Sequence, residues 1–338
     1  MRIAVDAMGG DDAPAVVVEG AVAASRQLRG HRIILVGDEA RISYHLAEFG
    51  YHGTNIDMVH APDAVGMHEK PVEAMRRKRR TSVAVAAELV HDGHADALVS
   101  AGNTGAAVAA SWLTFGTLPG IRKAGIAAPM PTRTGGVCVV IDAGANMAPT
   151  PTNLLQYGLM ADIYAKIAFN IQAPTVGLLN VGEEDAKGNN LAQEAFALLK
   201  ESHLNFIGNV EGNDIFHGAC DIVVCDGFAG NAILKAAEGL AQTMLAHLKT
   251  ELGKTIRRRV GAALCRTAFK AVASRMDCSE YGGAPLLGVN GITIIAHGAA
   301  NARAVFSGIS VAVRLAEMNL NRRITDEAEA VLVGKDGR

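Results

Sequence analysis

One pattern of apolar and polar positions recurs along the chain. Each copy is a continuous aliphatic run, then a loop of Gly, Asn or Asp, then a helix-period segment. The copies are RIAVDAMGGDD, ALVSAGNTGAA, VCVVIDAGAN, TVGLLNVGEEDAKGNN, DIVVCDGFAGN and GITIIAHGAANA. RIILVGD and FIGNVEGND predict further strands with polar exits. Apolar strands that alternate with helices are typical of a mainly parallel sheet covered on both faces.

The copies follow no fixed period, so we expect a layered α/β fold and not a solenoid. The 338 residues favour two lobes, and the absence of a flexible linker predicts that they are tightly joined. The composition agrees, because 4% aromatic residues and 37 glycines suit a core of small aliphatic side chains.

Charge and cysteine content exclude several classes of function. A net charge of −2 gives no support for nucleic-acid binding. The five cysteines contain no C-x-x-C pair, which predicts reduced thiols in a cytoplasmic protein and no zinc site. We expect a strand at the start of the sequence and no signal peptide there, and the uncharged stretch 97–121 is too polar and Gly-rich to be expected to span a membrane.

The loops at the strand exits carry the chemical signal. In wound α/β folds the carboxyl ends of the strands form the binding crevice. A single loop of this kind is explained equally well by turn geometry and helix capping. Six together favour an anion or polar-ligand site. No P-loop, dinucleotide fingerprint or nucleophile elbow is present, so ATP, NAD and a covalent serine or cysteine mechanism lack support.

Seven motifs, read in order, resemble one family. They are DAMGGDDAP, SAGNTGA, DAGAN, LLNVGEEDAKGN, VCDGFAGN, YGGAPLLGVNG and HGAANARA, and they cover the chain from about residue 2 to residue 315. This series resembles the bacterial fatty acyl-[acyl-carrier-protein]:phosphate acyltransferases of phospholipid synthesis. One such loop would be weak evidence, but seven in sequence are highly specific.

The resemblance implies a fold related to the phosphotransacetylases and the isocitrate/isopropylmalate dehydrogenases, a homodimer and no cofactor. It implies transfer of a long-chain acyl group from acyl-carrier protein (ACP) to inorganic phosphate, which attacks the thioester directly. The acyl phosphate would then pass to a membrane-bound glycerol-3-phosphate acyltransferase. By fold analogy we expect one unit over 1–330, with a first lobe of 1–155 plus 290–330 and a second lobe of 156–289.

Phosphate-binding candidates lie in three of the loops. In SAGNTGAA we expect hydrogen bonds from side chains at the strand exit, with glycines that let the backbone approach the anion. Helix capping is the alternative for this loop, and turn chemistry is the alternative for the other two. The candidates are Ser100, Gly102, Asn103, Thr104 and Gly105 of the first loop, Asn146 of DAGAN and Asn231 of DGFAGN.

Two residues are candidates for catalysis. Lys187, in a Gly-flanked loop, would offset the charge of phosphate or of the developing oxyanion. His297 would donate to phosphate or pass a proton to the leaving thiolate, although a loop-holding role fits it equally well. Three carboxylates that end strands are expected to cap helices and orient side chains, and no metal is expected. They are Asp6, Asp142 and Asp226.

Two basic stretches suggest partners. RRKRR at 76–80 precedes a helix that Thr81 or Ser82 should cap, and it is either a solvated charge run or a docking site for acidic ACP. Residues 254–276 hold seven Lys or Arg and no acid, and their apolar positions keep helical spacing. This predicts a basic amphipathic helix, either on an anionic membrane surface or in a core or dimer contact.

Three other functions stay open. A phosphotransacetylase that acts on a short acyl-CoA would share the anion cradle, and a decarboxylating dehydrogenase would share the broad fold. A non-enzymatic phosphate-binding regulator at the membrane surface would share the basic stretches.

Overall fold

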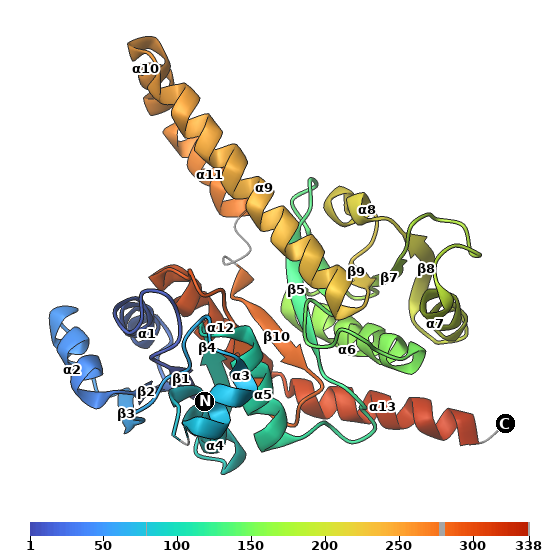
Figure 1. Ribbon diagram of the computed structural model, residues 1–338, viewed down its shortest axis with the longest axis horizontal. Coiled ribbons are helices and arrows are strands. Elements are labelled where there is room, and N and C mark those ends of the chain that lie inside the picture. Colours follow the sequence, from blue (N-terminus) through green and yellow to red (C-terminus); the bar gives the residue numbers. More distant parts are fainter. Residues whose placement is uncertain (79, 277–280, 337–338) are drawn as a thin grey trace.

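The computed structural model describes residues 1–78, 80–276 and 281–336. Eleven strands of this part of the chain form one continuous sheet (Figure 1). Its order is β3-β2-β1-β4-β11-β10-β5-β6-β9-β7-β8. The strands are β1 (Arg2–Asp6), β2 (Arg32–Gly37), β3 (Ile56–His60), β4 (Ala97–Ser100), β5 (Gly125–Pro131), β6 (Val137–Ile141), β7 (Thr175–Leu179), β8 (Asn205–Val210), β9 (Ile222–Val224), β10 (Ala284–Leu287) and β11 (Ile292–Ile295).

The sheet consists of two parallel halves with an antiparallel junction. Strands β3, β2, β1, β4 and β11 run parallel to their neighbours, as do β6, β9, β7 and β8. Between the halves, β10 pairs antiparallel with β11 and with β5, and β5 pairs antiparallel with β6. The predicted mainly parallel α/β sheet is therefore confirmed, and each aliphatic run quoted above forms a strand.

Helices follow the strands as the periodicity predicted. They are α1 (Ala15–Gln27), α2 (Glu39–Glu48), α3 (Pro71–Arg77), α4 (Ser82–His91), α5 (Thr104–Phe115), α6 (Pro151–Phe169), α7 (Asn190–Lys200), α8 (Gly212–His217), α9 (Gly227–Gly253), α10 (Ile256–Leu264), α11 (Arg266–Met276), α12 (Ala302–Glu317) and α13 (Leu320–Asp336). Thr81 caps α4, as its sequence position suggested, because its side chain accepts from the Ala84 amide.

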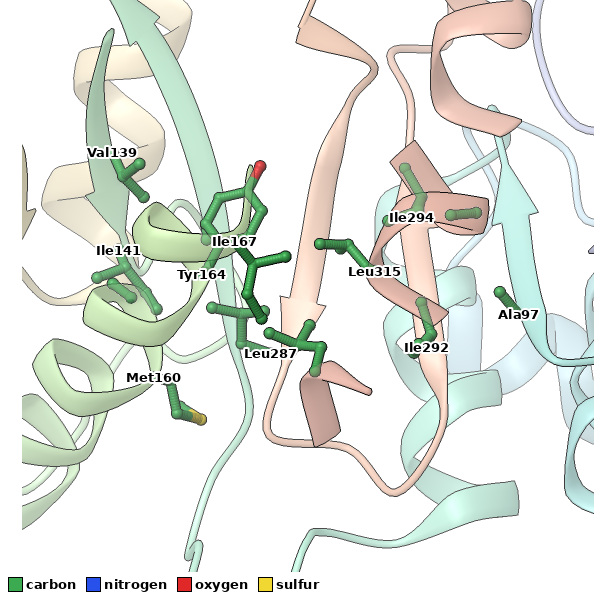
Figure 2. Packing of buried hydrophobic residues seen from close by; sticks show 14 of the residues in the cluster. Ala97, Val139, Ile141, Met160, Tyr164, Ile167, Leu287, Ile292, Ile294 and Leu315 are labelled. Carbon is green, nitrogen blue, oxygen red and sulfur yellow. The ribbon is translucent and has the colours of Figure 1, made fainter. Parts of the chain in front are cut away.

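Side chains of successive strand residues enter different core clusters, which shows that both faces of the sheet are covered. Ile3 and Val5 of β1 belong to one cluster, and Ala4 belongs to another. The first cluster crosses the antiparallel junction. Figure 2 shows Leu287 of β10 among Tyr164 and Ile167 of α6 and Leu315 of α12. The two halves thus share one core.

The segment 254–276 is not one helix. Thr255 caps α10, helical geometry ends at Cys265, and α11 begins at the next residue. Neither Pro nor Gly stands at the junction, so the break could not be predicted from the residues around it. With the far part of α9, these helices form an arm that projects from the body of the molecule (Figure 1).

Four cysteines are free thiols, and three of them are buried on or beside β6 and β9. They are Cys138, Cys220, Cys225 and the exposed Cys265. Cys278 lies outside the described residues.

Candidate functional site

A cavity of about 110 Å³, which we call the central cavity, lies at the antiparallel junction of the sheet. Its floor is apolar and is formed by β5, β10, β11 and one side of α9. Polar side chains come from the N-terminus of α5, the first turns of α9 and the loop after β11. These are Thr104, Asn231, Lys235, Glu238 and His297. Three of the sequence candidates, Thr104, Asn231 and His297, therefore line one cavity.

Lys235, Glu238 and His297 form a charged cluster at this cavity. Lys235 Nζ lies 2.8 Å from Glu238 Oε2, and His297 Nε2 lies 3.3 Å from the same oxygen. Lys235 Nζ and His297 Nε2 are 3.2 Å apart. Burial raises the pKa of Glu238, but hydrogen bonds and charge from His297 and Lys235 outweigh it, so the pKa lies below its ordinary value. Glu238 is therefore an anion that holds two nitrogen donors together.

Backbone contacts fix the imidazole of His297. Its Nδ1 accepts a hydrogen bond from the Ala299 amide at 3.1 Å, which in the neutral ring leaves the proton on Nε2. The Ala300 amide donates to the carbonyl of His297, and Asn301 then caps α12. The loop-holding role and the donor role expected for His297 are thus compatible, because they use different atoms.

The SAGNTGAA loop is held from behind by Asp6. Ser100 Oγ donates to Asp6 Oδ2 at 2.7 Å and accepts from the Gly102 amide at 3.1 Å. Burial raises the pKa of Asp6, while hydrogen bonds from Ser82 and Ser100 act to lower it. Ser100 is only 1% exposed, so this network positions the loop from inside.

The side chain of Asn103 joins the SAGNTGAA loop to the segment 67–69, which precedes α3. Its Oδ1 accepts from the Ala106 amide and so caps α5, while its Nδ2 donates to the carbonyls of Met67 and Glu69. Thr104, one residue on, is exposed and reaches the central cavity. Gly102 leaves little room for a side chain, since a Cβ there would lie 3.1 Å from Gly9 Cα. Direct contact of these residues with phosphate stays a prediction.

Asp142 orders the backbone of the segment 142–146, which we call the wall of the central cavity. Its carboxylate accepts from four backbone amides, those of Ile126, Gly144, Ala145 and Asn146. Burial raises the pKa of Asp142, although these four N–H groups act to lower it. The side chain of Asn146 donates to the Ala124 carbonyl and to the Tyr157 hydroxyl, so it supports this wall.

The N-terminus of α9 packs directly on this wall. Asp226 caps the helix by accepting from the Ala229 amide. A Cβ on Gly227 would lie 2.5 Å from the Asn146 carbonyl oxygen, and one on Gly230 would lie 2.0 Å from that of Asp142. Because no side chain fits at either glycine, the first turn of α9 is held at a fixed distance from the wall, and so are Asn231 and Lys235.

Lys187 lies elsewhere, in the β7–α7 loop. Its side chain is 51% exposed, and its Nζ is 3.8 Å from Glu184 Oε1. Asn180 and Gln193 hold the loop through the carbonyls of Lys187 and Ala186. This loop borders a second cavity, and none of its residues lines the central one.

Lys235 and Glu238 were not among the candidates from the sequence. Both follow the DGFAGN motif on the same helix, four and seven residues after Asn231. Residues at these spacings share one face of a helix, so extending the motif by two turns would have found them.

The carboxylates Asp6, Asp142 and Asp226 do not converge. Each is occupied by the loop or helix that it supports. Within residues 1–78, 80–276 and 281–336, no group of His, Cys, Asp or Glu side chains has the arrangement of a metal site.

The two basic stretches lie on the surface. Arg77 and Lys78 pair with Glu69, and Arg76 and Arg80 are exposed; Arg79 lies outside the described residues. On α10 the apolar Ile256, Val260 and Leu264 are 75%, 56% and 81% exposed beside exposed arginines. The side chains predicted at 270, 275 and 276 lie outside the description. No helix in the described part of the chain is long and apolar enough to cross a membrane.

Comparisons with solved structures agree with this fold. A phosphotransacetylase from Streptococcus pyogenes is similar with a TM-score of 0.63 and 18% identity, covering 94% of each chain. A branched-chain phosphotransacylase from Enterococcus faecalis V583 is similar with a TM-score of 0.58 and 15% identity, covering 94% of this chain and 99% of the other.

Sequence comparisons are closer. A phosphate acyltransferase from Pelotomaculum thermopropionicum is 46% identical over 333 residues, which are 98% of this chain and 96% of the relative. A phosphate acyltransferase from Brevibacillus brevis is 43% identical and covers 99% of both chains. The family model described as "Fatty acid synthesis protein" matches residues 1–323. The chain therefore belongs to this fatty acid synthesis protein family and is an acyltransferase related to the phosphate acyltransferases.

Proposed function

We propose that this enzyme transfers an acyl group from acyl-ACP to inorganic phosphate, giving acyl phosphate and free ACP. The central cavity carries the proposal, because it places an ammonium group, an imidazole N–H and two small polar side chains beside an apolar floor. A dianion and the beginning of a hydrocarbon chain would both be satisfied there. The names of the relatives support phosphate as the acyl acceptor.

The chemistry needs positioning and charge compensation more than a protein nucleophile. An oxygen of hydrogen phosphate forms a bond to the thioester carbonyl carbon, the C–S bond breaks, and the thiolate takes up the proton that the phosphate loses. Lys235 would offset the charge of phosphate, while Thr104 and Asn231 would orient it. The Nε2–H of His297 would donate to the oxygen that gains charge on the carbonyl. A thiol with a pKa of about 8.5 leaves without strong acid catalysis.

Lys187 retains the catalytic role proposed from the sequence. Its Nζ lies 3.8 Å from the exposed carboxylate of Glu184, so it could turn toward a substrate that crosses the β7–α7 loop. An exposed pair of this kind contributes little to stability and would be exchanged readily for a contact with the bound substrate.

ACP would dock near α3. Arg76 and Arg80 are exposed there, and Asn103 ties the preceding loop to the entrance of α5. An acidic carrier protein would therefore meet positive charge beside the cavity that receives its acyl group.

A second copy of the chain would pack along α9. Leu240, Met244 and Leu248 are spaced four residues apart and are 63%, 57% and 40% exposed, so they form an uncovered apolar stripe. At the end of the arm, the apolar and basic side chains of α10 would contact an anionic membrane surface. There the product would pass to a membrane glycerol-3-phosphate acyltransferase.

One assay tests the reaction. The protein is mixed with hexadecanoyl-ACP and phosphate, and acyl phosphate is trapped with hydroxylamine; a sample without phosphate measures direct attack on the thioester. We expect phosphate-dependent acyl hydroxamate, strongly reduced in Lys235→Met and unchanged in the control Lys249→Met on the exposed part of α9. Product from acetyl-CoA but not from acyl-ACP would select the phosphotransacetylase alternative, and product from neither would overturn the proposed transfer to phosphate.

A further inference from the structure

A second cavity, of about 290 Å³, lies at the carboxyl ends of β7 and β9, and the central-site chemistry does not use it. It is more than twice as large as the central cavity. Its inner surface is aliphatic and comes from α6, β7, α7 and α9. The residues are Leu154, Leu178, Leu179, Leu191, Ala192 and Ala229.

The polar side chains at its rim are already occupied. Asn180 accepts from the Val181 amide and donates to the Lys187 carbonyl. Asn189 and Asp226 accept from the Ala192 and Ala229 amides as helix caps. Because these groups are engaged in the loops that carry them, the surface that remains for a ligand is mainly hydrocarbon.

Three large apolar side chains on or near the segments that line this cavity are exposed. Val181, which lines the cavity, is 80% exposed, and Phe228, beside Ala229, is 72% exposed. Met147 is 57% exposed and follows Asn146, whose carbonyl accepts from the Gly227 amide at the start of α9. Exposed apolar side chains on the segments next to the cavity favour an apolar ligand that would cover them.

The two cavities flank the first two turns of α9. Ala229 faces the second cavity, whereas Asn231 and Leu234 face the central one. The floor of the central cavity lies on β5, and the floor of the second cavity lies on β7. In the sheet, β7 is three strand positions away from β5. At about 4.8 Å per strand this is roughly 14 Å, which a long acyl chain can span and an acetyl group cannot.

We infer that the second cavity binds the distal hydrocarbon part of the substrate acyl chain while its thioester reacts at the central cavity. The inference rests on the proposed acyl transfer and names a chain-length subsite for it. The central cavity has the smaller volume of the two, and the second offers the aliphatic surface that a long chain requires. Val181, Phe228 and Met147 would cover the chain between the two.

A pair of alanines on α7 provides the test. Ala192 lines the cavity, and Ala197 is exposed on the same helix. Each methylene kept out of an apolar site costs about fourfold in affinity, from ~0.8 kcal/mol per CH₂. We expect Ala192→Trp to lower kcat/KM for hexadecanoyl-ACP at least tenfold and to leave butyryl-ACP within about twofold, while Ala197→Trp changes neither. An unchanged ratio of the two substrates in Ala192→Trp would overturn the inference.

Val181→Asp provides a second test. The side chain of Val181 is exposed, so this substitution should not disturb folding. Val181→Asp should lower kcat/KM for hexadecanoyl-ACP more than kcat/KM for butyryl-ACP. Equal effects on the two substrates would count against the subsite. Binding of the fluorescent fatty acid cis-parinarate is measured without turnover. It should be lost in Ala192→Trp and kept in Ala197→Trp.

These readouts separate the two proposals. If no acyl-ACP yields acyl phosphate while parinarate binding still depends on Ala192, the proposed function fails and the hydrocarbon site stands. If acyl phosphate forms but both chain-length preference and parinarate binding ignore Ala192, the hydrocarbon site fails alone.

Discussion

His297 Nε2 lies 3.3 Å from Glu238 Oε2, across the central cavity and 59 residues away in the chain. The contact joins the loop after β11 to the second turn beyond the DGFAGN motif on α9. Glu238 also receives the ammonium of Lys235, so one carboxylate positions both donors.

Glu238→Gln should therefore reduce turnover, and it should lower the free energy of unfolding by an amount that depends on pH. Ionised Glu238 is favoured in the folded protein, because its pKa lies below the ordinary value of about 4.3. Its contribution to stability is present above that ordinary pKa and is lost as the pH falls through the lower folded pKa. The difference in unfolding free energy between wild type and Glu238→Gln should be largest near neutral pH and shrink in acid. Urea unfolding over this pH range checks it, and a constant difference would contradict it.

Thr104→Val and Ser100→Ala should have separable effects. Thr104 is exposed at the central cavity, so its loss should raise KM for phosphate severalfold and leave the Tm unchanged. Ser100 is buried against Asp6, and removing its hydroxyl leaves that carboxylate short of a donor. We expect Ser100→Ala to lower unfolding free energy by about 1–3 kcal/mol. Should Ser100→Ala instead raise only KM for phosphate, Ser100 would be a direct ligand.

Lys187→Ala should lower turnover at least tenfold while the protein stays folded. The lysine is exposed, so its removal should change the free energy of unfolding little, whereas the proposed contact with the substrate would be lost. Lys200→Ala is the matched control, because Lys200 also pairs with an acid of this loop, Asp185. Near wild-type turnover in Lys187→Ala would remove this residue from the mechanism.

Two glycines of α9 should respond oppositely to alanine. A Cβ on Gly230 would meet the Asp142 carbonyl at 2.0 Å, whereas one on Gly239 would meet nothing within 4 Å. Gly239→Ala should stabilise by roughly 0.5–1 kcal/mol from helix propensity. Gly230→Ala should displace the helix start, lowering both stability and turnover. Thermal unfolding and the hydroxamate assay measure the two effects, and a benign Gly230→Ala would show that the wall can move.

Vesicle binding should depend on α10. The protein should co-sediment with anionic vesicles at low salt and much less with neutral ones, because basic and apolar side chains are exposed together. Leu264→Asp should abolish binding, while the acyl-ACP assay in solution remains unaffected. Equal sedimentation of wild type and Leu264→Asp would show that vesicle binding does not depend on α10.

The strands, the helix caps and the position of the site were accessible from sequence, because they depend on local periodicity and on Gly, Asn and Asp at the strand exits. Thr104, Asn231 and His297, which line the central cavity, were candidates on this basis. The roles of Ser100 and Asn146 were not, since their partners Asp6 and Tyr157 are set by packing between distant elements. The break at Cys265 lacks any local signal. Lys235 and Glu238 have the composition of an ordinary solvated helix face, and only the approach of His297 distinguishes them.

The place of β11 in the sheet has a consequence for biosynthesis. Residues 292–295 lie between β4 and β10, inside the half that begins with β1. During translation, the edge of β4 therefore has no partner until nearly 300 residues have left the ribosome. The N-terminal half must wait for the rest of the chain, so ribosome-bound intermediates carry an open parallel edge, the kind of surface that chaperones protect.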